Sequence, residues 1–493
     1  MAIPKICGIE TEYGIITRGT NLNAVNGSSI LINAYVNDQT RRIGWDYMHE
    51  RPGHDARGWG VDYTAPELEY HLVNTVLTNG ARYYVDHAHP EISTPECRTA
   101  YEALLYDRAA EEIIRLSMEG LKNVLSPDQE IVLYKNNSDG KGNSYGCHEN
   151  YLVARSYPFG RLAALMTPHF VTRQIYTGAG KVGCEAADSE PDSVSFQISQ
   201  RADFFEEEIG LETTLKRPII NTRDEPHCDP QKYRRLHVIV GDANMSETAT
   251  YLKVGVTAII LSMIEDEALI DPVILSRPVP AMRLVSYDLT LSSLLALEDG
   301  RKMSALDIQW KYLESARKYQ LSHGLESVGI SDGERILDLW GQTLEALNND
   351  SASLAHTLDW VAKKRLIDGY ADRHGLQPSD PRLKAIDLQY SDMRPDKCLA
   401  SKVGLTRILD QESVAQAIDN PPVSTRAYFR GQCLKKWPAN IAAANWDSMV
   451  FDVGDEPLKR VEMNEPLKGT QELVGDIIRA AQTPQDLLKL LSG

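Results

Sequence analysis

The sequence predicts an α+β protein with one large domain and one small C-terminal domain, and three observations support this prediction. Strand-like segments alternate with turns from residue 3 to residue 240. From about 251 to 410 apolar residues recur at helical spacing. The chain of 493 residues also exceeds the usual size of one domain. We therefore predict a mainly antiparallel sheet backed by helices in residues 1–410 and a separate unit in residues 411–493.

The composition is that of a globular protein, with 42% hydrophobic and 25% charged residues. A net charge of −17 argues against general nucleic-acid binding, although arginines between residues 201 and 235 could form a local basic groove. No uninterrupted apolar run approaches the roughly 18 residues that span a bilayer, and the N-terminus lacks a signal-peptide pattern, so we expect a cytoplasmic protein without a membrane partner. The seven cysteines are scattered without a Cys-x-x-Cys pair, which excludes a disulfide framework or a zinc ribbon.

Residues 3–16 predict the first strand. Because side chains alternate between faces, Glu10 and Glu12 share one face and Thr11 lies on the other. Two neighbouring carboxylates repel each other, and a divalent cation such as Mg²⁺ would compensate them. A solvated face is the alternative interpretation.

Residues 81–86 predict a central strand that follows a turn at Asn79-Gly80. Arg82, Tyr84 and Asp86 project to one face, which therefore carries a cation, a phenol and a carboxylate in a row. Pro90 is expected to stop this strand. Taken alone, the segment also fits an edge strand with a solvated polar face.

The stretch between these two strands, residues 17–80, lacks a clear period and is predicted to be irregular. Its segment 43–62 is rich in Gly, Trp, Arg and Asp. A long irregular excursion between strands is uncommon unless it is functional, so we predict an inserted loop over the site.

Two apparent motifs fail. His148-Glu149 does not continue to a second histidine, because Leu152 stands four residues after His148. The run at 178–181 lacks the upstream glycine of a phosphate-binding loop, and Val182 follows its lysine.

The region 195–247 holds the densest polar cluster. Arg201, Arg217 and Arg223 suit a polyphosphate, since guanidinium groups bind phosphate bidentately, but they could equally form surface ion pairs. His237 shares a strand face with Ile239, so a core histidine is the alternative there. Later segments predict helices at 251–268, 305–318, 334–349 (with Ser331 or Asp332 as N-cap) and 353–368.

Several long motifs together resemble one family. They are GIETEYG (8–14), ARYYVDHAHPE (81–91), YKNNSDGKGNSYGCHENY (134–151), SQRADF (199–204), RPIINTRDEPH (217–227), YRRLHVIVGDANMSE (233–247) and, near the end, RAYFRGQC and WDSMVFD. They look like the actinobacterial Pup-processing family, which contains the Pup ligase and the deamidase/depupylase of Pup. This resemblance implies the glutamine synthetase-like carboxylate–amine ligase fold, with a curved sheet.

Within that family the sequence looks more like the depupylase. The strand continues Asp86-His87-Ala88-His89, where the ligase form has Gly-Ser after its aspartate, and the loop with Gly44-Trp45-Asp46 is similar to the depupylase insertion. The resemblance implies ATP- and Mg²⁺-dependent hydrolysis of the C-terminal glutamine amide of Pup and of the Pup–lysine isopeptide bond. Pup, pupylated proteins and a functional link to the bacterial proteasome are the implied partners. The alternatives are the Pup ligase and a catalytically silent Pup-binding regulator.

The resemblance also implies roles for individual residues. Asp86 is the expected catalytic carboxylate, either as nucleophile or as general base, and a third route uses phosphate retained from ATP. The expected metal ligands are Glu10, Tyr84 and Glu91, and the expected ATP contacts are Arg82, Thr94 and Trp446. By analogy with the wider ligase fold, a further metal or nucleotide shell is expected from Glu12, His148, Glu149 and His237, and a phosphate clamp from Arg201, Arg217 and Arg223.

Overall fold

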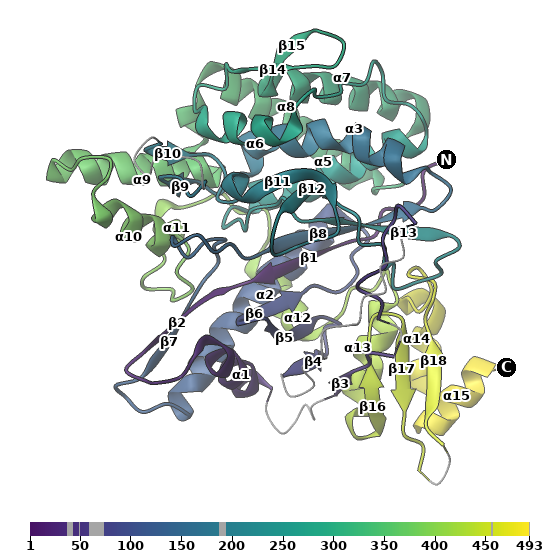
Figure 1. The fold of residues 1–493 in the computed structure, drawn as a ribbon. Coiled ribbons are helices and arrows are strands. Elements are labelled where there is room, and N and C mark those ends of the chain that lie inside the picture. Colours follow the sequence, from purple (N-terminus) through teal and green to yellow (C-terminus); the bar gives the residue numbers. More distant parts are fainter. Residues whose placement is uncertain (37–42, 49, 59–72, 187–193, 455–456, 493) are drawn as a thin grey trace.

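A ten-stranded sheet forms the centre of the protein in the computed structural model, which describes all residues except 37–42, 49, 59–72, 187–193, 455–456 and 493. Within the sheet all described pairs are antiparallel except β3 with β16. Figure 1 shows β8 and β1 crossing the middle of the molecule. In spatial order the strands are β13 (Tyr233–Val238), β8 (Cys147–Ala154), β1 (Cys7–Glu12), β6 (His89–Ser93), β5 (Arg82–Asp86), β4 (Asn74–Val76), β3 (Gly44–Trp45), β16 (Ile441–Ala444), β17 (Ser448–Phe451) and β18 (Lys459–Glu462).

One face of the sheet packs on helices. In α2 (Ala100–Gly120) the N-cap Thr99 accepts a hydrogen bond from the backbone of Glu102, and Ser117 accepts one from Tyr83 of β5. Helix α5 (Glu247–Glu265) lies beside α2 and beneath β8. It is long and apolar enough to cross a membrane, but its whole apolar window is buried inside the fold, as in the central helix of a globular core. This arrangement confirms the predicted α+β architecture.

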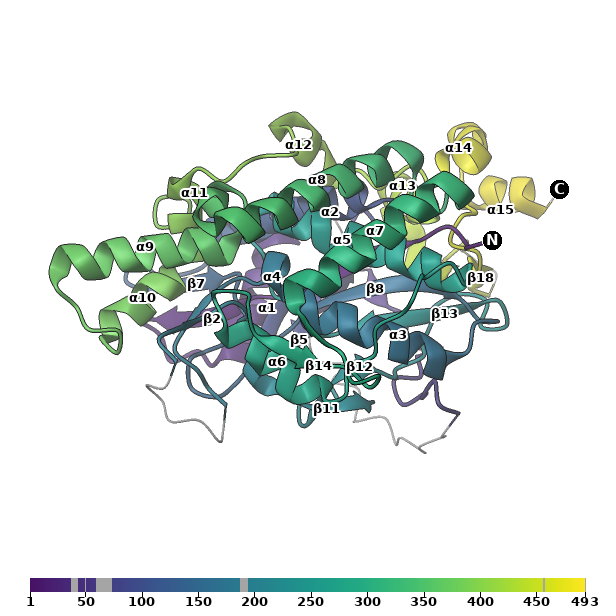
Figure 2. The same cartoon turned by 90° about the horizontal axis from the view of Figure 1, so that it is seen from above.

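The remaining helices pack around this centre, and Figure 2 shows α7, α8 and α9 covering the top of the molecule. They are α3 (Phe159–Thr172), α4 (Gln174–Thr177), α6 (Pro278–Tyr287), α7 (Ala305–His323), α8 (Ile330–Asn349), α9 (Asp359–His374), α10 (Pro381–Tyr390), α11 (Leu399–Val403), α12 (Gln411–Asp419), α13 (Ala427–Lys436), α14 (Gln471–Ala480) and α15 (Pro484–Ser492). The small ladders pair β2 (Gly14–Arg18) with β7 (Glu130–Tyr134), β9 (Lys181–Val182) with β10 (Phe196–Gln197), β11 (Phe205–Gly210) with β12 (Arg217–Asn221), and β14 (Leu294–Ala296) with β15 (Lys302–Ser304).

The prediction of an irregular segment over residues 17–80 was wrong in part, because α1 (Ala24–Tyr35), β3 and β4 lie within it. The N-cap Asn23 accepts from the backbone of Asn26, and Leu31 and Ile32 of α1 are fully buried. The helix contains glycine, serine and asparagine and no charged residue, so its packing rather than its propensity stabilises it. Residues 59–72 of the predicted loop lie outside the described residues.

Two further predictions about element ends were also wrong. Helix α8 begins at Ile330 after the N-cap Gly329, not after Ser331 or Asp332. Pro90 does not end the central strand, since it lies inside β6 and pairs with Val85. A two-residue turn ends β5 instead.

The C-terminal part of the chain has its own apolar cluster, which includes Trp437, Met449 and Phe451. The same cluster contains Ile43 and Trp45, and β16 joins the central sheet by pairing with β3. In Figure 1 these C-terminal elements lie beside β3 and β4. The division at residues 410 and 411 stays a prediction, and strand pairing connects its two sides.

Candidate active site

The face of the sheet opposite the helices carries a grid of polar side chains. The register places Glu10 of β1 between His148 of β8 and Ser93 of β6. One row further along, Glu12 lies opposite Glu91, and Glu91 lies opposite Tyr84 of β5. Residues paired in an antiparallel ladder project to the same face. The predicted strand faces therefore meet across four neighbouring strands.

The first cluster consists of Glu10, His148 and His237, whose donor atoms lie within 4.8 Å of one another. Asn150 supports it, donating from Nδ2 to Glu10 Oε1 at 2.7 Å, while its Oδ1 lies 3.0 Å from His237 Nδ1. Because that oxygen can only accept, His237 Nδ1 carries the proton and Nε2 remains a ligand atom. His237 is buried, as a core histidine would be, and it also faces the cluster, so its role as a ligand stays a prediction.

The charges in the first cluster favour an ionised Glu10. Burial alone would raise its pKa, but the hydrogen bond from His148 and the charge of Arg235 hold the pKa well below its usual range. Burial and the neighbouring Arg235 lower the pKa of His237 well below its usual value, so its imidazole is neutral. A carboxylate and neutral imidazoles are the donor set of a divalent metal site.

The second cluster brings together the carboxylates of Glu12, Asp86 and Glu91, again within 4.8 Å. Burial raises the pKa of Glu91 well above its usual value, and the carboxylates of Asp86, Glu12 and Glu10 raise it further. Such crowding of like charges is unfavourable on a sheet unless a cation compensates it. Hard oxygen ligands at this density fit Mg²⁺, so the residues present suit the expected metal.

Asp86 occupies the last position of β5, where it pairs with His89 across the turn. Its Oδ2 lies 3.0 Å from Nδ1 of His87. Burial works against ionisation of Asp86, but the hydrogen bond and charge of His87 and the charge of His148 lower its pKa overall. Asp86 is therefore an ionised carboxylate at neutral pH.

Arg82 lies in a stack of aromatic rings. Its guanidinium is 3.9 Å from the ring centre of Tyr84 and 4.0 Å from that of Trp45. Trp45 in turn packs edge to face on Trp446, with ring centres 5.2 Å apart. Cation–π contacts on both sides fix the direction of Arg82. The stack joins the strand of Asp86 to the C-terminal part of the chain.

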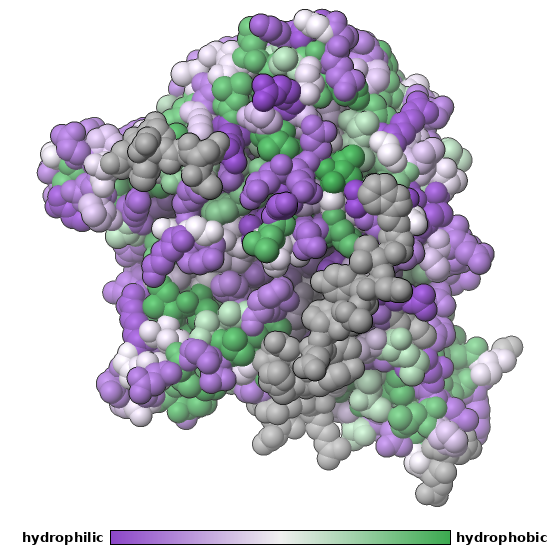
Figure 3. Space-filling view, viewed as in Figure 1, coloured by the Kyte–Doolittle hydropathy of each residue, from purple (hydrophilic) through white to green (hydrophobic). Residues whose placement is uncertain are grey.

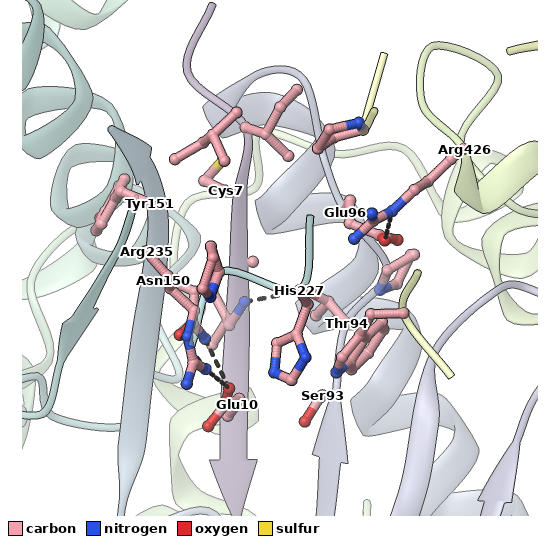
Figure 4. Close-up of a pocket in the computed structure, with 18 residues that line it drawn as sticks. Cys7, Glu10, Ser93, Thr94, Glu96, Asn150, Tyr151, His227, Arg235 and Arg426 are labelled. Atoms are coloured by element: carbon pink, nitrogen blue, oxygen red, sulfur yellow. Dashed lines mark hydrogen bonds and ion pairs between the residues drawn. The ribbon is translucent and has the colours of Figure 1, made fainter. Parts of the chain in front are cut away.

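A pocket opens beside Glu10 between β1, β6 and the C-terminal part (Figure 4). Thr94 lines it and accepts a hydrogen bond from the backbone of Ile9 at 3.0 Å, and Trp446 lines it as well. The apolar part of its lining includes Ile6, Cys7, Ile9, Leu152 and Pro466. A pocket with few polar groups and mainly apolar walls is typical of a small-molecule site.

The three arginines predicted as one clamp lie in two places. Arg201 donates to Ser144 Oγ at 3.3 Å and Arg217 to the Ser144 carbonyl at 2.8 Å. Burial and the charge of Arg217 lower the pKa of Arg201 to about 10, and the charge of Glu12 partly opposes this shift. Arg223 lies instead on the side of Arg235, where its charge contributes to lowering the pKa of Arg235 and of His237.

Sequence reasoning missed Asn150 and Arg235, although both follow from the period of two. Asn150 stands two residues after His148, and Arg235 two residues before His237, so each shares its neighbour's face. Glu149 faces the other way. It is fully buried and accepts from Arg173 at 2.6 and 2.8 Å, so it does not belong to the metal shell predicted for it.

The comparisons with known proteins agree on one family. The profile described as Pup-ligase protein matches residues 5–450. The chain is 48% identical to the depupylase of Acidothermus cellulolyticus and 42% identical to the Pup deamidase/depupylase of Mycobacterium tuberculosis, and each alignment covers 99% of both proteins. A Pup–protein ligase of Kineococcus radiotolerans is 39% identical over 82% of this chain and 90% of its own length.

Two solved structures resemble the whole fold. The complex between the prokaryotic ubiquitin-like protein Pup and its ligase PafA has a TM-score of 0.79 at 32% identity, covering 99% of this chain and 95% of that one. The Pup ligase PafA in complex with ADP has a TM-score of 0.74 at 37% identity, covering 82% and 89%.

Proposed function

Because the chain belongs to the Pup-ligase protein family, we propose that it is a Pup deamidase and depupylase. With ATP and Mg²⁺ it hydrolyses the side-chain amide of a C-terminal glutamine of Pup and the isopeptide bond between Pup and a substrate lysine. The full-length identity of 48% and 42% to proteins named for these activities supports the hydrolase, since the ligase of Kineococcus radiotolerans aligns over only 82% of the chain.

The pocket beside Glu10 is the proposed nucleotide site. Trp446 offers a ring for a base, and Thr94 offers a polar contact. Arg82, the other expected ATP contact, lies outside the pocket lining and stacks on Trp45, which packs on Trp446. The similarity to PafA, which was solved with ADP, supports nucleotide use. Arg201 and Arg217 are not part of the pocket lining, and the charge of Glu12 acts on both of them.

Two cation positions are proposed on the grid. Glu10, His148 and His237 would hold one cation, and Glu12 and Glu91, with the phenol of Tyr84 opposite, would hold the other. Bound Mg²⁺ would supply positive charge that offsets the oxyanion of the attacked amide. The chain itself keeps Glu10 ionised and His237 neutral without the metal.

Asp86 is the proposed catalytic carboxylate. It is ionised, it stands at the rim of the second cluster, and more than a third of its side chain is exposed, so a substrate can reach it. An ionised carboxylate in this position either attacks the carbonyl carbon or takes a proton from the attacking water. In both routes the end of β5 and the contact with His87 hold the carboxylate of Asp86 in place.

The decisive experiment combines purified protein, ATP, Mg²⁺ and Pup ending in glutamine, and follows Pup by intact mass. Conversion of the amide to the acid, lost in Asp86→Asn and lost without nucleotide, is the expected result. Asp86→Asn keeps the size and hydrogen bonding of the side chain, so its circular dichroism spectrum should match the wild type. Pup that remains unconverted, together with conjugate formed from Pup ending in glutamate and a lysine-bearing protein, would identify a ligase. Binding without either reaction would identify a regulator.

A further inference from the structure

The loop between β12 and β13 reaches the proposed nucleotide pocket at His227, which lines it. His227 has a φ of 47°, in the left-handed region that residues with a Cβ rarely adopt. Before it, the backbone N–H of Asp224 donates to the carbonyl of His54 at 2.8 Å. After it, the N–H of Asp229 donates to the carbonyl of Asn464 at 3.0 Å. The loop is therefore anchored on both sides of a strained residue, and strain of this kind is concentrated at functional sites.

The imidazole of His227 lies in the pocket, and Figure 4 shows it between Glu10 and Thr94. Its Nε2 is 3.9 Å from Oε2 of Glu225, which is too far for a hydrogen bond. Within the described ranges of the chain, neither ring nitrogen makes a hydrogen bond. A buried polar group usually has a partner, so a ring in a ligand pocket without one points to a ligand atom.

The imidazole of His227 is neutral, and the charge beside it decides which nitrogen carries the proton. Burial lowers the pKa of His227 to about 4, although the charge of Glu225 opposes the shift. Burial opposes ionisation of Glu225, but the charge of Arg235 and the hydrogen bond from the backbone of Arg51 lower its pKa overall. The ionised carboxylate attracts the N–H of the ring to Nε2. Since a neutral imidazole has one N–H only, Nδ1 keeps its lone pair and acts as an acceptor.

We propose that His227 selects the base of the bound nucleotide, an inference that rests on the nucleotide site of the proposed function. Nδ1 accepts a hydrogen bond from the exocyclic amino group of a 6-aminopurine, while the ring of Trp446 packs on the same base. A 6-oxopurine directs a carbonyl oxygen at Nδ1 instead, so two acceptors face each other and neither is satisfied. The pocket therefore accepts adenine nucleotides and rejects nucleotides of guanine and hypoxanthine.

The test compares ATP with ITP, in which a carbonyl replaces the amino group at position 6. Dissociation constants of the full-length protein with Mg²⁺ are measured by displacement of a fluorescent ATP analogue. We expect the wild type to bind ATP roughly 10- to 100-fold more tightly than ITP. His227→Gly removes the ring and relieves the positive φ, so it should bind the two nucleotides about equally. His227→Asn tolerates a positive φ, and its amide can turn either its oxygen or its NH₂ to the base, so it should also lose the preference.

His356 is exposed and is not part of the pocket lining, so His356→Gly is the matched control and should keep the wild-type preference. A wild type without a preference for ATP overturns the proposal, as does a preference that both His227 variants retain. Equal losses of affinity for ATP and ITP would make His227 a wall of the pocket only and also overturn it. Hydrolysis of Pup is a separate readout. A protein that prefers ATP as expected but leaves Pup unchanged keeps the base selection and overturns the hydrolase.

Discussion

Glu12 of β1 and Glu91 of β6 lie directly opposite each other in the sheet register, with their carboxylates on the same face. Glu91 is almost completely buried, and its pKa is raised well above the usual value by burial and by Asp86, Glu12 and Glu10. The two carboxylates repel each other when both are ionised, and a divalent cation at the proposed position would offset this repulsion.

The first prediction follows from that pair. Glu91→Gln replaces the buried carboxyl group by an uncharged amide of the same size. It should raise thermal stability in EDTA, because it relieves the repulsion from the neighbouring carboxylates. Mg²⁺ should stabilise the wild type by about 2.7 kcal/mol at a concentration 100 times its dissociation constant, and the variant by clearly less. Calorimetric scans with EDTA and with Mg²⁺ measure both effects. If Mg²⁺ does not change the melting temperature of the wild type, the result argues against a cation at this pair.

The second prediction concerns the Arg82 stack. Arg82→Lys keeps the positive charge but loses the flat guanidinium between Tyr84 and Trp45. Loss of cation–π stacking of roughly 1 kcal/mol should weaken nucleotide binding about fivefold, with kcat changing less than KM for ATP. Titration with a fluorescent ATP analogue measures the affinity directly. Arg382 is exposed, so Arg382→Lys is the control. An unchanged affinity in Arg82→Lys would show that Arg82 does not contact the nucleotide.

The third prediction is a dependence of stability on pH. Glu96 pairs with Arg426 (Nε–Oε1, 2.7 Å) and with Arg430, and although burial opposes ionisation, these two charges lower its pKa to about 2. A lowered pKa in the folded state stabilises the protein above the unfolded value near 4.5, and the stability is lost as pH falls toward 2. The shift corresponds to about 3 kcal/mol at neutral pH.

Urea denaturation from pH 7 to pH 2.5 checks this pair. Glu96→Gln should be about 3 kcal/mol less stable than the wild type at pH 7, and the difference should shrink steadily below pH 4.5. A difference that stays constant with pH would mean that packing, and not charge, accounts for the effect.

The fourth prediction concerns the reverse side of β8. Glu149 and Arg173 form a fully buried ion pair, and Tyr151 also donates to Glu149, at 2.6 Å. Arg173→Met leaves a buried carboxylate without its cation and should cost about 3–5 kcal/mol in the free energy of unfolding. The double variant Glu149→Leu/Arg173→Met should recover most of this loss. Chemical denaturation of the three proteins gives the comparison, and additive losses would contradict it.

The strands of the site were predictable because alternation alone assigns a face to Glu10, Glu12 and Asp86. That these side chains lie close together was not predictable, because it depends on which strands pair and in what register. Neighbouring strands such as β1 and β8 are far apart in sequence. Helix α1 was not predicted because its glycine, serine and asparagine residues have low helix propensity, and its stability comes from the N-cap Asn23 and from burial. The family motif did not predict the position of Glu149. Its neighbour His148 faces the site, while Glu149 faces the core.

The parallel pairing of β3 with β16 has a consequence for biosynthesis. Both clusters of carboxylates and histidines are complete once the chain has been made as far as β13, but the pocket beside Glu10 still lacks Trp446 and Pro466. A chain emerging from the ribosome therefore has these acidic groups before it has a complete pocket beside Glu10. Contacts between segments this distant in sequence form late in folding. We therefore expect nucleotide binding in the proposed pocket only after the C-terminal part of the chain has folded.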